Sequence, residues 1–186
     1  MLKKYLCLVL AVLIIGSQVA CDSTHKSGSS SESIQGSHPM SSMAMDLGSS
    51  LPAGLEEAAH PKFPKGGKVI LLADHMPGMK SAKATIVGAY RTHVYSVTYK
   101  PVTGGKTIRN HKWVVQQELA TQSKKLLPTG AKVKLNANHM QGMRGATGRI
   151  DTAQTTTVYI VNYKDTRTGK LVKDHRWVIE SELKAR

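Results

Sequence analysis

The sequence has 186 residues, 40% of them hydrophobic, and a formal net charge of +14 from 26 Lys and Arg against 12 Asp and Glu. That length allows one ordinary domain or two small ones, and a mean hydropathy of -0.25 excludes a polytopic membrane protein. The charge favours a polyanionic partner such as nucleic acid, anionic lipid or wall polymer, but one Phe, two Trp and six Tyr offer few stacking platforms for single-stranded nucleic acid.

Residues 1–21 have the pattern of a secretory signal peptide. Lys3 and Lys4 precede an apolar run over residues 6–15, which is too short to span a bilayer because about 20 residues are needed. Val19-Ala20-Cys21 resembles a bacterial lipobox, in which the cysteine is acylated and becomes the mature N-terminus. We therefore expect a lipid anchor at Cys21 that holds the protein on the extracytoplasmic face of the cell membrane. The alternative is ordinary secretion with Cys21 as a free thiol.

The cysteine count supports this interpretation. Cys7 leaves with the signal and Cys21 carries the lipid, so the folded part contains no cysteine. Disulfides, zinc sites built on cysteine and thiol catalysis are excluded there. An extracytoplasmic address also argues against nucleic acid as a partner.

Residues 22–60 are rich in Ser, Gly and small polar residues, which predicts a flexible, disordered tether. This segment contains His38, Met40, Met43 and Met45, whose spacing resembles the methionine tracts of copper-trafficking proteins. We treat these four residues as auxiliary metal ligands. Their binding is expected to be weak, because ordering the chain costs about 1–2 kcal/mol per residue.

The rest of the sequence is an internal duplication with a constant offset of 64 residues. Repeat 1 covers residues 64–120 and repeat 2 covers residues 128–184, with roughly 25 identities over 54 positions. The two copies share, among other segments, His-Met-x-Gly-Met and His-Lys/Arg-Trp-Val. A duplication predicts that functional features come in pairs.

Each repeat is predicted to consist of short strands. In repeat 1 these are Lys68–Ala73, Ala82–Gly88, His93–Tyr99 and Trp113–Val115, with a hairpin turn at Thr103–Gly105. The predicted fold is all-β, with two tandem small SH3-like barrel-type repeats. Each repeat is marginal at this size, which favours packing of the two copies on one another.

The positions of methionine carry the main chemical signal. Apart from Met1 the sequence has seven methionines, all within a few residues of His38, His75 or His139 and none within a predicted strand. Thioether sulfur is a soft ligand that suits Cu(I), and imidazole also binds copper. Thioethers do not form disulfides, so they serve in oxidising compartments. The candidate ligands in the repeats are His75, Met76, Met79, His139, Met140 and Met143.

Other interpretations of these residues stay open. The methionines of the two turns can instead fill the ends of hydrophobic cores, with the histidines exposed. His111 and His175 are further candidate ligands, or are packing and hydrogen-bonding residues beside Trp113 and Trp177. No nucleophile motif or phosphate-binding loop is present, so we expect no enzymatic activity.

The tandem repeat resembles the YdhK-type bacterial lipoprotein family. The resemblance rests on the segments Ala73–Met79, Val94–Tyr99 and Asn110–Val114, and covers about residues 64–184 together with the leader and the tether. It implies a cell-surface copper-binding protein that protects against copper toxicity alongside copper-exporting ATPases. It also implies the six ligands named above. Asn138 and Gln141 replace Asp74 and Pro77 in the second copy.

Two classes of function therefore compete. The first is a non-enzymatic Cu(I)-binding lipoprotein that sequesters or transfers copper. The second is an envelope-binding module whose basic repeats adhere to anionic cell-wall polymer without metal. From Ala59 onward the chain has 23 basic and seven acidic residues, a net charge of +16. That charge would repel a free copper cation, so it fits anionic lipid or wall polymer better than metal recruitment.

Overall fold

The computed structural model describes residues 50–186. The predicted signal peptide (1–21), the predicted acylation site Cys21 and most of the predicted tether lie outside these residues. The same is true of the auxiliary candidate ligands His38, Met40, Met43 and Met45.

The described chain is all-β, as predicted. Its eight strands form one sheet in which every pairing is antiparallel. In chain order the elements are β1 (Glu56–Glu57), β2 (Lys68–Leu71), β3 (Lys83–Tyr99), β4 (Ile108–Val115), the 3-10 turn η1 (Gln116–Glu118), β5 (Lys132–Lys134), β6 (Thr147–Lys164), β7 (Leu171–Ile179), the 3-10 turn η2 (Glu180–Glu182) and β8 (Leu183–Ala185). Among the described residues, no helix has the length and apolar character needed to cross a membrane.

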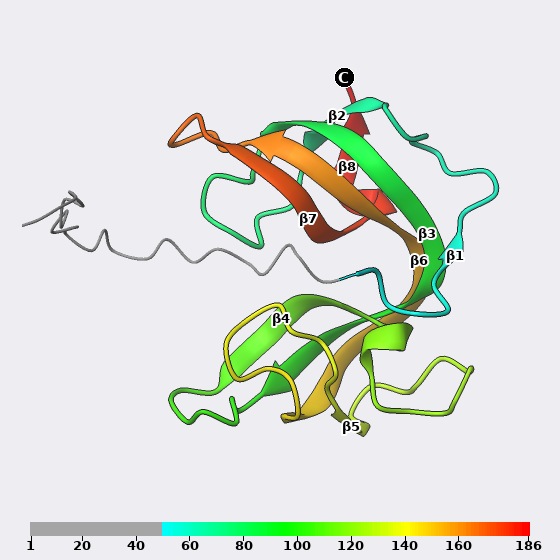
Figure 1. Cartoon of the computed structure of the whole chain (residues 1–186), viewed down its shortest axis with the longest axis vertical. Coiled ribbons are helices and arrows are strands. Elements are labelled where there is room, and N and C mark those ends of the chain that lie inside the picture. The colour runs from blue at the N-terminus through cyan, green and yellow to red at the C-terminus, as the bar shows by residue number, and fades with distance from the viewer. Residues whose placement is uncertain (1–49) are drawn as a thin grey trace, which may run out of the picture. The chain divides into compact units, whose positions relative to one another are not determined.

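The strands β3 and β6 are the longest elements and run side by side (Figure 1). They pair from Ala84↔Tyr163 to Tyr99↔Gly148. The two strands predicted over residues 82–88 and 93–99 are therefore one strand. Gly88 does not end it but lies at a shift in register, where a Cβ would come within 2.8 Å of the Tyr90 hydroxyl. Continuous pairing with β6 satisfies the backbone hydrogen bonds across this position.

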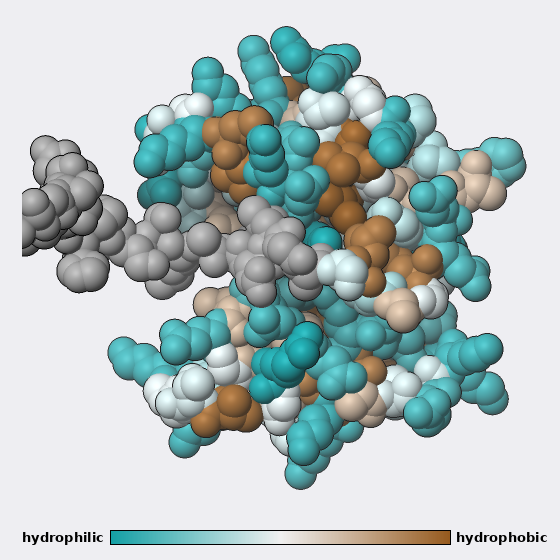
Figure 2. Space-filling view, in the orientation of Figure 1, coloured by the Kyte–Doolittle hydropathy of each residue, from teal (hydrophilic) through white to brown (hydrophobic). Residues whose placement is uncertain are grey.

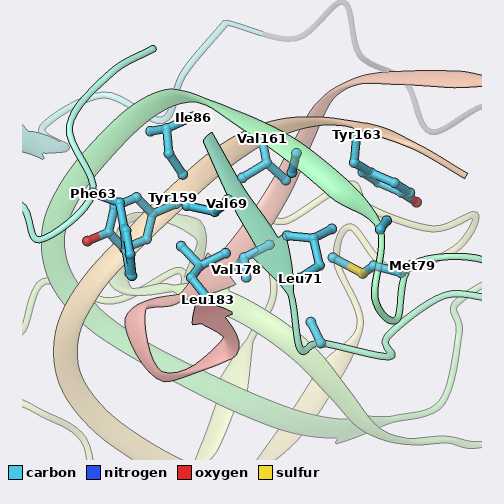
Figure 3. Close-up of a cluster of buried hydrophobic side chains, with 13 residues drawn as sticks. Phe63, Val69, Leu71, Met79, Ile86, Tyr159, Val161, Tyr163, Val178 and Leu183 are labelled. Atoms are coloured by element: carbon cyan, nitrogen blue, oxygen red, sulfur yellow. The ribbon is translucent and has the colours of Figure 1, made fainter. Parts of the chain in front are cut away.

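Two hydrophobic cores lie toward the opposite ends of β3 and β6, and each mixes the two repeats. The first core combines Phe63, Val69, Leu71, Ala73, Met79, Ala82, Ala84 and Ile86 of the first half of the molecule with Tyr159, Val161, Tyr163, Val178 and Leu183 of repeat 2 (Figure 3). The second core combines Tyr95, Val97, Tyr99, Val114 and Leu119 with Leu135, Ala137, Met143, Ala146 and Ile150. The repeats thus exchange halves and do not form two consecutive barrels.

A third hydrophobic cluster, the central cluster, joins the two cores. It takes four residues from each repeat: Tyr90, Val94, Trp113, Val115, Val158, Ile160, Trp177 and Ile179. Both indoles are buried, with exposed fractions of 5% and 0%. Burial of such side chains contributes about 1.5–3 kcal/mol each. The cluster lies where a pseudo-two-fold axis, passing near Thr92↔Thr156, relates the two copies.

The end of the predicted tether belongs to the fold. Glu56 and Glu57 pair with Arg91 and Tyr90 of β3. The Ala58 N–H donates a hydrogen bond of 3.0 Å to the carbonyl of residue 89, and residue 55 packs against the central cluster. The flexible segment predicted for residues 22–60 is therefore shorter at its C-terminal end.

Candidate metal centre

Each His-Met-x-Gly-Met segment forms a turn after a short strand. The Met79 N–H donates to the Met76 carbonyl at 3.2 Å, and the Met143 N–H donates to the Met140 carbonyl at 3.1 Å. The intervening glycines have φ of 84° and 74°, a left-handed conformation that glycine adopts without steric cost. The predicted duplication of the turn is confirmed in its backbone geometry.

Each turn is held by the β-hairpin of the other repeat. The Thr166 N–H donates to the Gly78 carbonyl, and the Val102 N–H donates to the Gly142 carbonyl, both at 2.9 Å. A Cβ at Gly142 would overlap the Thr103 hydroxyl. Glycine is therefore required at this position for two reasons, which are its backbone angle and the close approach of the hairpin.

This close approach gives a test with a matched control. Gly142→Ala is expected to lower the free energy of unfolding by about 1–2 kcal/mol for the backbone angle and by about 1–3 kcal/mol more for the overlap. Gly130→Ala has only the first effect, because Gly130 has φ of 87° and nothing within 4 Å of the added Cβ. Urea denaturation measures both. Equal losses would show that the hairpin does not constrain the turn.

The methionines of the two turns differ in burial. Met79 and Met143 are 0% exposed and lie inside the first and second cores, as the packing interpretation expects. Figure 3 shows the Met79 side chain beside Leu71 in the first core. Met76 is half-buried, and Met140 is 39% exposed. The turns thus place one thioether inside and one nearer the surface.

The histidines of the turns are not exposed, and each is fixed by a carboxylate. The Nε2 of His75 donates to Glu182 at 2.7 Å, and the Nε2 of His139 donates to Glu118 at 2.7 Å. The two imidazoles are only 6% and 12% exposed. Because an ionised carboxylate only accepts hydrogen bonds, the proton of each neutral ring lies on Nε2 and the lone pair on Nδ1.

The carboxylates are held by the two tryptophans of the central cluster. The Trp113 indole N–H donates to Glu182 at 2.9 Å, and the Trp177 indole N–H donates to Glu118 at 3.1 Å. Burial alone would raise the pKa of the Glu182 carboxyl, but the hydrogen bonds from His75 and Trp113 hold that pKa below its ordinary value. Each repeat's tryptophan thus positions the carboxylate of the other repeat.

The glutamates were missed as site residues in the sequence. His75 and Glu182 are 107 positions apart, so no local motif joins them. The signal that could have identified them is the duplication, because Glu118 and Glu182 are equivalent under the offset of 64.

His111 and His175 lie on β4 and β7, and His111 faces His139 of the second turn. The Nε2 of His111 is 3.3 Å from the Nδ1 of His139, and the two ring centroids are 5.6 Å apart. His175 is 2% exposed and neither of its ring nitrogens has a hydrogen-bond partner. The Nδ1 of His75 is also buried without a partner.

Both of these histidines are neutral near pH 7. Burial, together with the nearby His139 and His75, lowers the pKa of His111 to about 4. Burial, with the same two histidines nearby, lowers the pKa of His175 to about 3. The lone pairs of these rings therefore remain available as donors at neutral pH.

One pair of imidazoles, His111 and His139, lies close enough for both rings to bind one ion. Within residues 50–186, no three His, Cys, Asp or Glu side chains are grouped so as to hold a metal ion by themselves. A pocket of about 320 Å³ adjoins one pair, lined by Glu118 and His139 with Arg144 and Arg176. The pocket reaches His139 of this pair.

Three comparisons relate the chain to known proteins. The family model described as "Protein of unknown function (DUF1541)" matches twice, over residues 65–116 and 129–180. The uncharacterized protein YdhK of Bacillus subtilis (strain 168) is 41% identical over 189 residues, which cover 100% of this chain and 91% of that protein. The double match confirms the predicted tandem repeat.

Two solved structures share the fold. The crystal structure of the DUF1541 family protein ydhK from Bacillus subtilis subsp. subtilis str. 168 has 48% sequence identity and a TM-score of 0.73, and covers 75% of this chain and 96% of its own. The solution NMR structure of the ydhK C-terminal domain from B. subtilis has 48% identity and a TM-score of 0.64, covering 67% and 94%. These matches confirm the resemblance to YdhK.

Proposed function

The chain belongs to the DUF1541 family, and we propose that it is a non-enzymatic, extracytoplasmic lipoprotein that binds Cu(I) and sequesters or transfers it in copper tolerance. The observation that carries this proposal is the pair of equivalent turns. Each turn presents a largely buried imidazole, His75 or His139, with its Nε2 held by a carboxylate and its lone pair on Nδ1. Within the YdhK-type family, the sequence resembles the copper-resistance lipoprotein CopL, and this resemblance points to the same function.

The arrangement matches what copper ligands need. Histidine ligands are commonly oriented by a carboxylate on the second ring nitrogen, which also raises the basicity of the coordinating nitrogen. Met76 and Met79 follow His75 in the same turn, and thioether sulfur selects soft cations such as Cu(I). Neutral donors also avoid the need to lose a proton on metal binding.

The charge of the chain supports a place at the cell surface. The face shown in Figure 2 is mostly hydrophilic, and the region from Ala59 onward carries a net charge of +16. A lipid at Cys21 would anchor the protein to the membrane, and the basic repeats would rest on anionic lipid or wall polymer. A copper-exporting ATPase is the expected source of the metal.

A Cu(I) competition experiment tests the proposal. The wild-type chain and a Met76, Met79, Met140, Met143→Leu variant are titrated against a chromophoric chelator under reducing conditions. Leucine nearly conserves the methionine volume, so the fold is retained, which thermal unfolding checks. We expect the wild type to bind copper at least about 10-fold more tightly.

Two double variants sharpen this experiment. Met76→Leu with Met140→Leu removes the outer thioethers, and Met79→Leu with Met143→Leu removes the buried ones. Equal copper uptake by all variants would exclude methionine ligation in the repeats.

The competing function is an envelope-binding module, which the charge of +16 favours. Salt-sensitive binding to isolated cell wall without copper uptake would establish that module instead.

A further inference from the structure

We propose that each copper centre is built from both repeats, with His111 joining His139 at one centre and His175 joining His75 at the other. This inference rests on the proposed copper binding and identifies the ligands that complete it. His139 belongs to repeat 2 and His111 to repeat 1, and their nitrogens approach to 3.3 Å. Two nitrogens bound to one tetrahedral metal ion at about 2.0 Å lie about 3.3 Å apart, so the spacing suits a shared ion.

The second centre carries an independent observation. His175 is 2% exposed, yet both of its ring nitrogens lack a hydrogen-bond partner, and the Nδ1 of His75 lacks one too. Buried polar atoms are nearly always satisfied, so an exception calls for an explanation, and a bound ion supplies one here. Under the offset of 64 residues, His175 and His75 are the equivalents of His111 and His139, so the duplication pairs them in the same way.

The surrounding shell fixes which nitrogen of each turn histidine carries the lone pair. Glu118 fixes the Nε2 proton of His139, and Glu182 fixes that of His75, so the coordinating atom is Nδ1 in both rings. The indoles of Trp177 and Trp113 hold these carboxylates in place. The carboxylate–imidazole arrangement is the one found around metal-bound histidines.

Copper binding by the two histidines needs no external acid or base to supply or remove a proton. In the metal-free pair the His111 Nε2–H donates to the lone pair of His139 Nδ1. Copper binding requires His111 to move its proton from Nε2 to Nδ1, which exchanges one neutral tautomer for the other. The Cu(I) ion then takes the place of that proton between the two rings, and no net proton is released.

Each partner histidine packs against a tyrosine of the core that contains a buried thioether. Met143 shares the second core with Tyr99, whose ring centroid is 6.1 Å from that of His111. Met79 shares the first core with Tyr163, whose ring centroid is 5.6 Å from that of His175.

Imidazole NMR on the full mature chain tests the inference. Cu(I) is diamagnetic, so long-range proton–nitrogen spectra can follow each ring nitrogen during titration. We expect the Nδ1 of His139 and His75, and one nitrogen each of His111 and His175, to shift on saturation with two equivalents. His60, which is exposed, should not shift.

Variants supply the second measurement. His111→Gln and His175→Gln should each lose one high-affinity equivalent in chelator competition, and Glu118→Gln should weaken one site by about 10–100-fold. His60→Gln is the matched control. Wild-type copper binding without shifts at His111 and His175, and with unchanged affinity in their variants, would overturn the inference but leave the proposed function intact. A wild type that binds no copper would overturn both, and if a variant fails to fold, the wild-type spectrum still decides.

Discussion

The metal-free chain is expected to lose stability steeply as the pH falls from 6.5 to 4. The pKa of His111 is lowered to about 4 and that of His175 to about 3, both chiefly by burial. In the unfolded chain both rings titrate near 6.5. Below that pH the unfolded state binds protons that the folded state does not, so acid favours unfolding. Each ring contributes about 1.4 kcal/mol per pH unit across this range.

The pH range over which stability is lost has a lower limit for each histidine. The effect of His111 ends near pH 4 and that of His175 near pH 3, where the folded state takes up the same protons. The neighbouring charges act in both directions, since His75 and His139 oppose protonation while Glu118 and Glu182 favour it. Burial remains the largest cause and sets the direction.

Urea denaturation at several pH values measures this dependence. His111→Gln and His175→Gln should each reduce the slope of the unfolding free energy against pH by about 1.4 kcal/mol per unit. His60→Gln, at an exposed position, should leave the slope unchanged. Identical slopes in all four proteins would mean that these rings titrate normally in the folded state.

Replacing Glu118 by alanine should destabilise the chain by about 3–5 kcal/mol. Glu118 is 8% exposed and accepts hydrogen bonds from the imidazole of His139, the indole of Trp177 and the N–H of Val115. Removing it leaves three donors without their acceptor in a buried environment, and each unsatisfied group costs about 1–3 kcal/mol. The loss is therefore much larger than for an exposed carboxylate.

Glu56→Ala is the matched control, because Glu56 is exposed and pairs only through its backbone. Its expected loss is within about 0.5 kcal/mol. Chemical denaturation gives both values, and the indole N–H resonance of Trp177 reports on the lost hydrogen bond directly. A loss for Glu118→Ala as small as that of the control would show that the network contributes little to stability.

Much of the fold was predictable from local patterns. Alternating apolar and β-branched residues predicted the strands, and paired glycines predicted the hairpin after β3, where the Gly104 N–H donates to the Pro101 carbonyl at 3.0 Å. The constant offset predicted a duplication. The single long β3 was not predicted, because a glycine such as Gly88 usually interrupts a strand. Only the pairing with β6 shows that the strand continues through Gly88.

Local sequence patterns could not predict that the two repeats exchange halves. The alternation within a strand shows which face is buried, but not which segment covers it. Tyr95 and Leu135 meet in the second core although they belong to different copies. The same limit applies to the site, where methionine spacing identified His75 and His139 while the carboxylates that fix them come from distant positions.

The exchange of halves between the repeats also explains how such a molecule can arise. A chain with a single repeat would hold half of each core, so two such chains would have to associate with two-fold symmetry before either core was complete. Joining the copies in tandem turns that encounter between molecules into the folding of one molecule. Stability then no longer depends on protein concentration. The duplicated chain is, in this sense, a homodimer encoded in one gene.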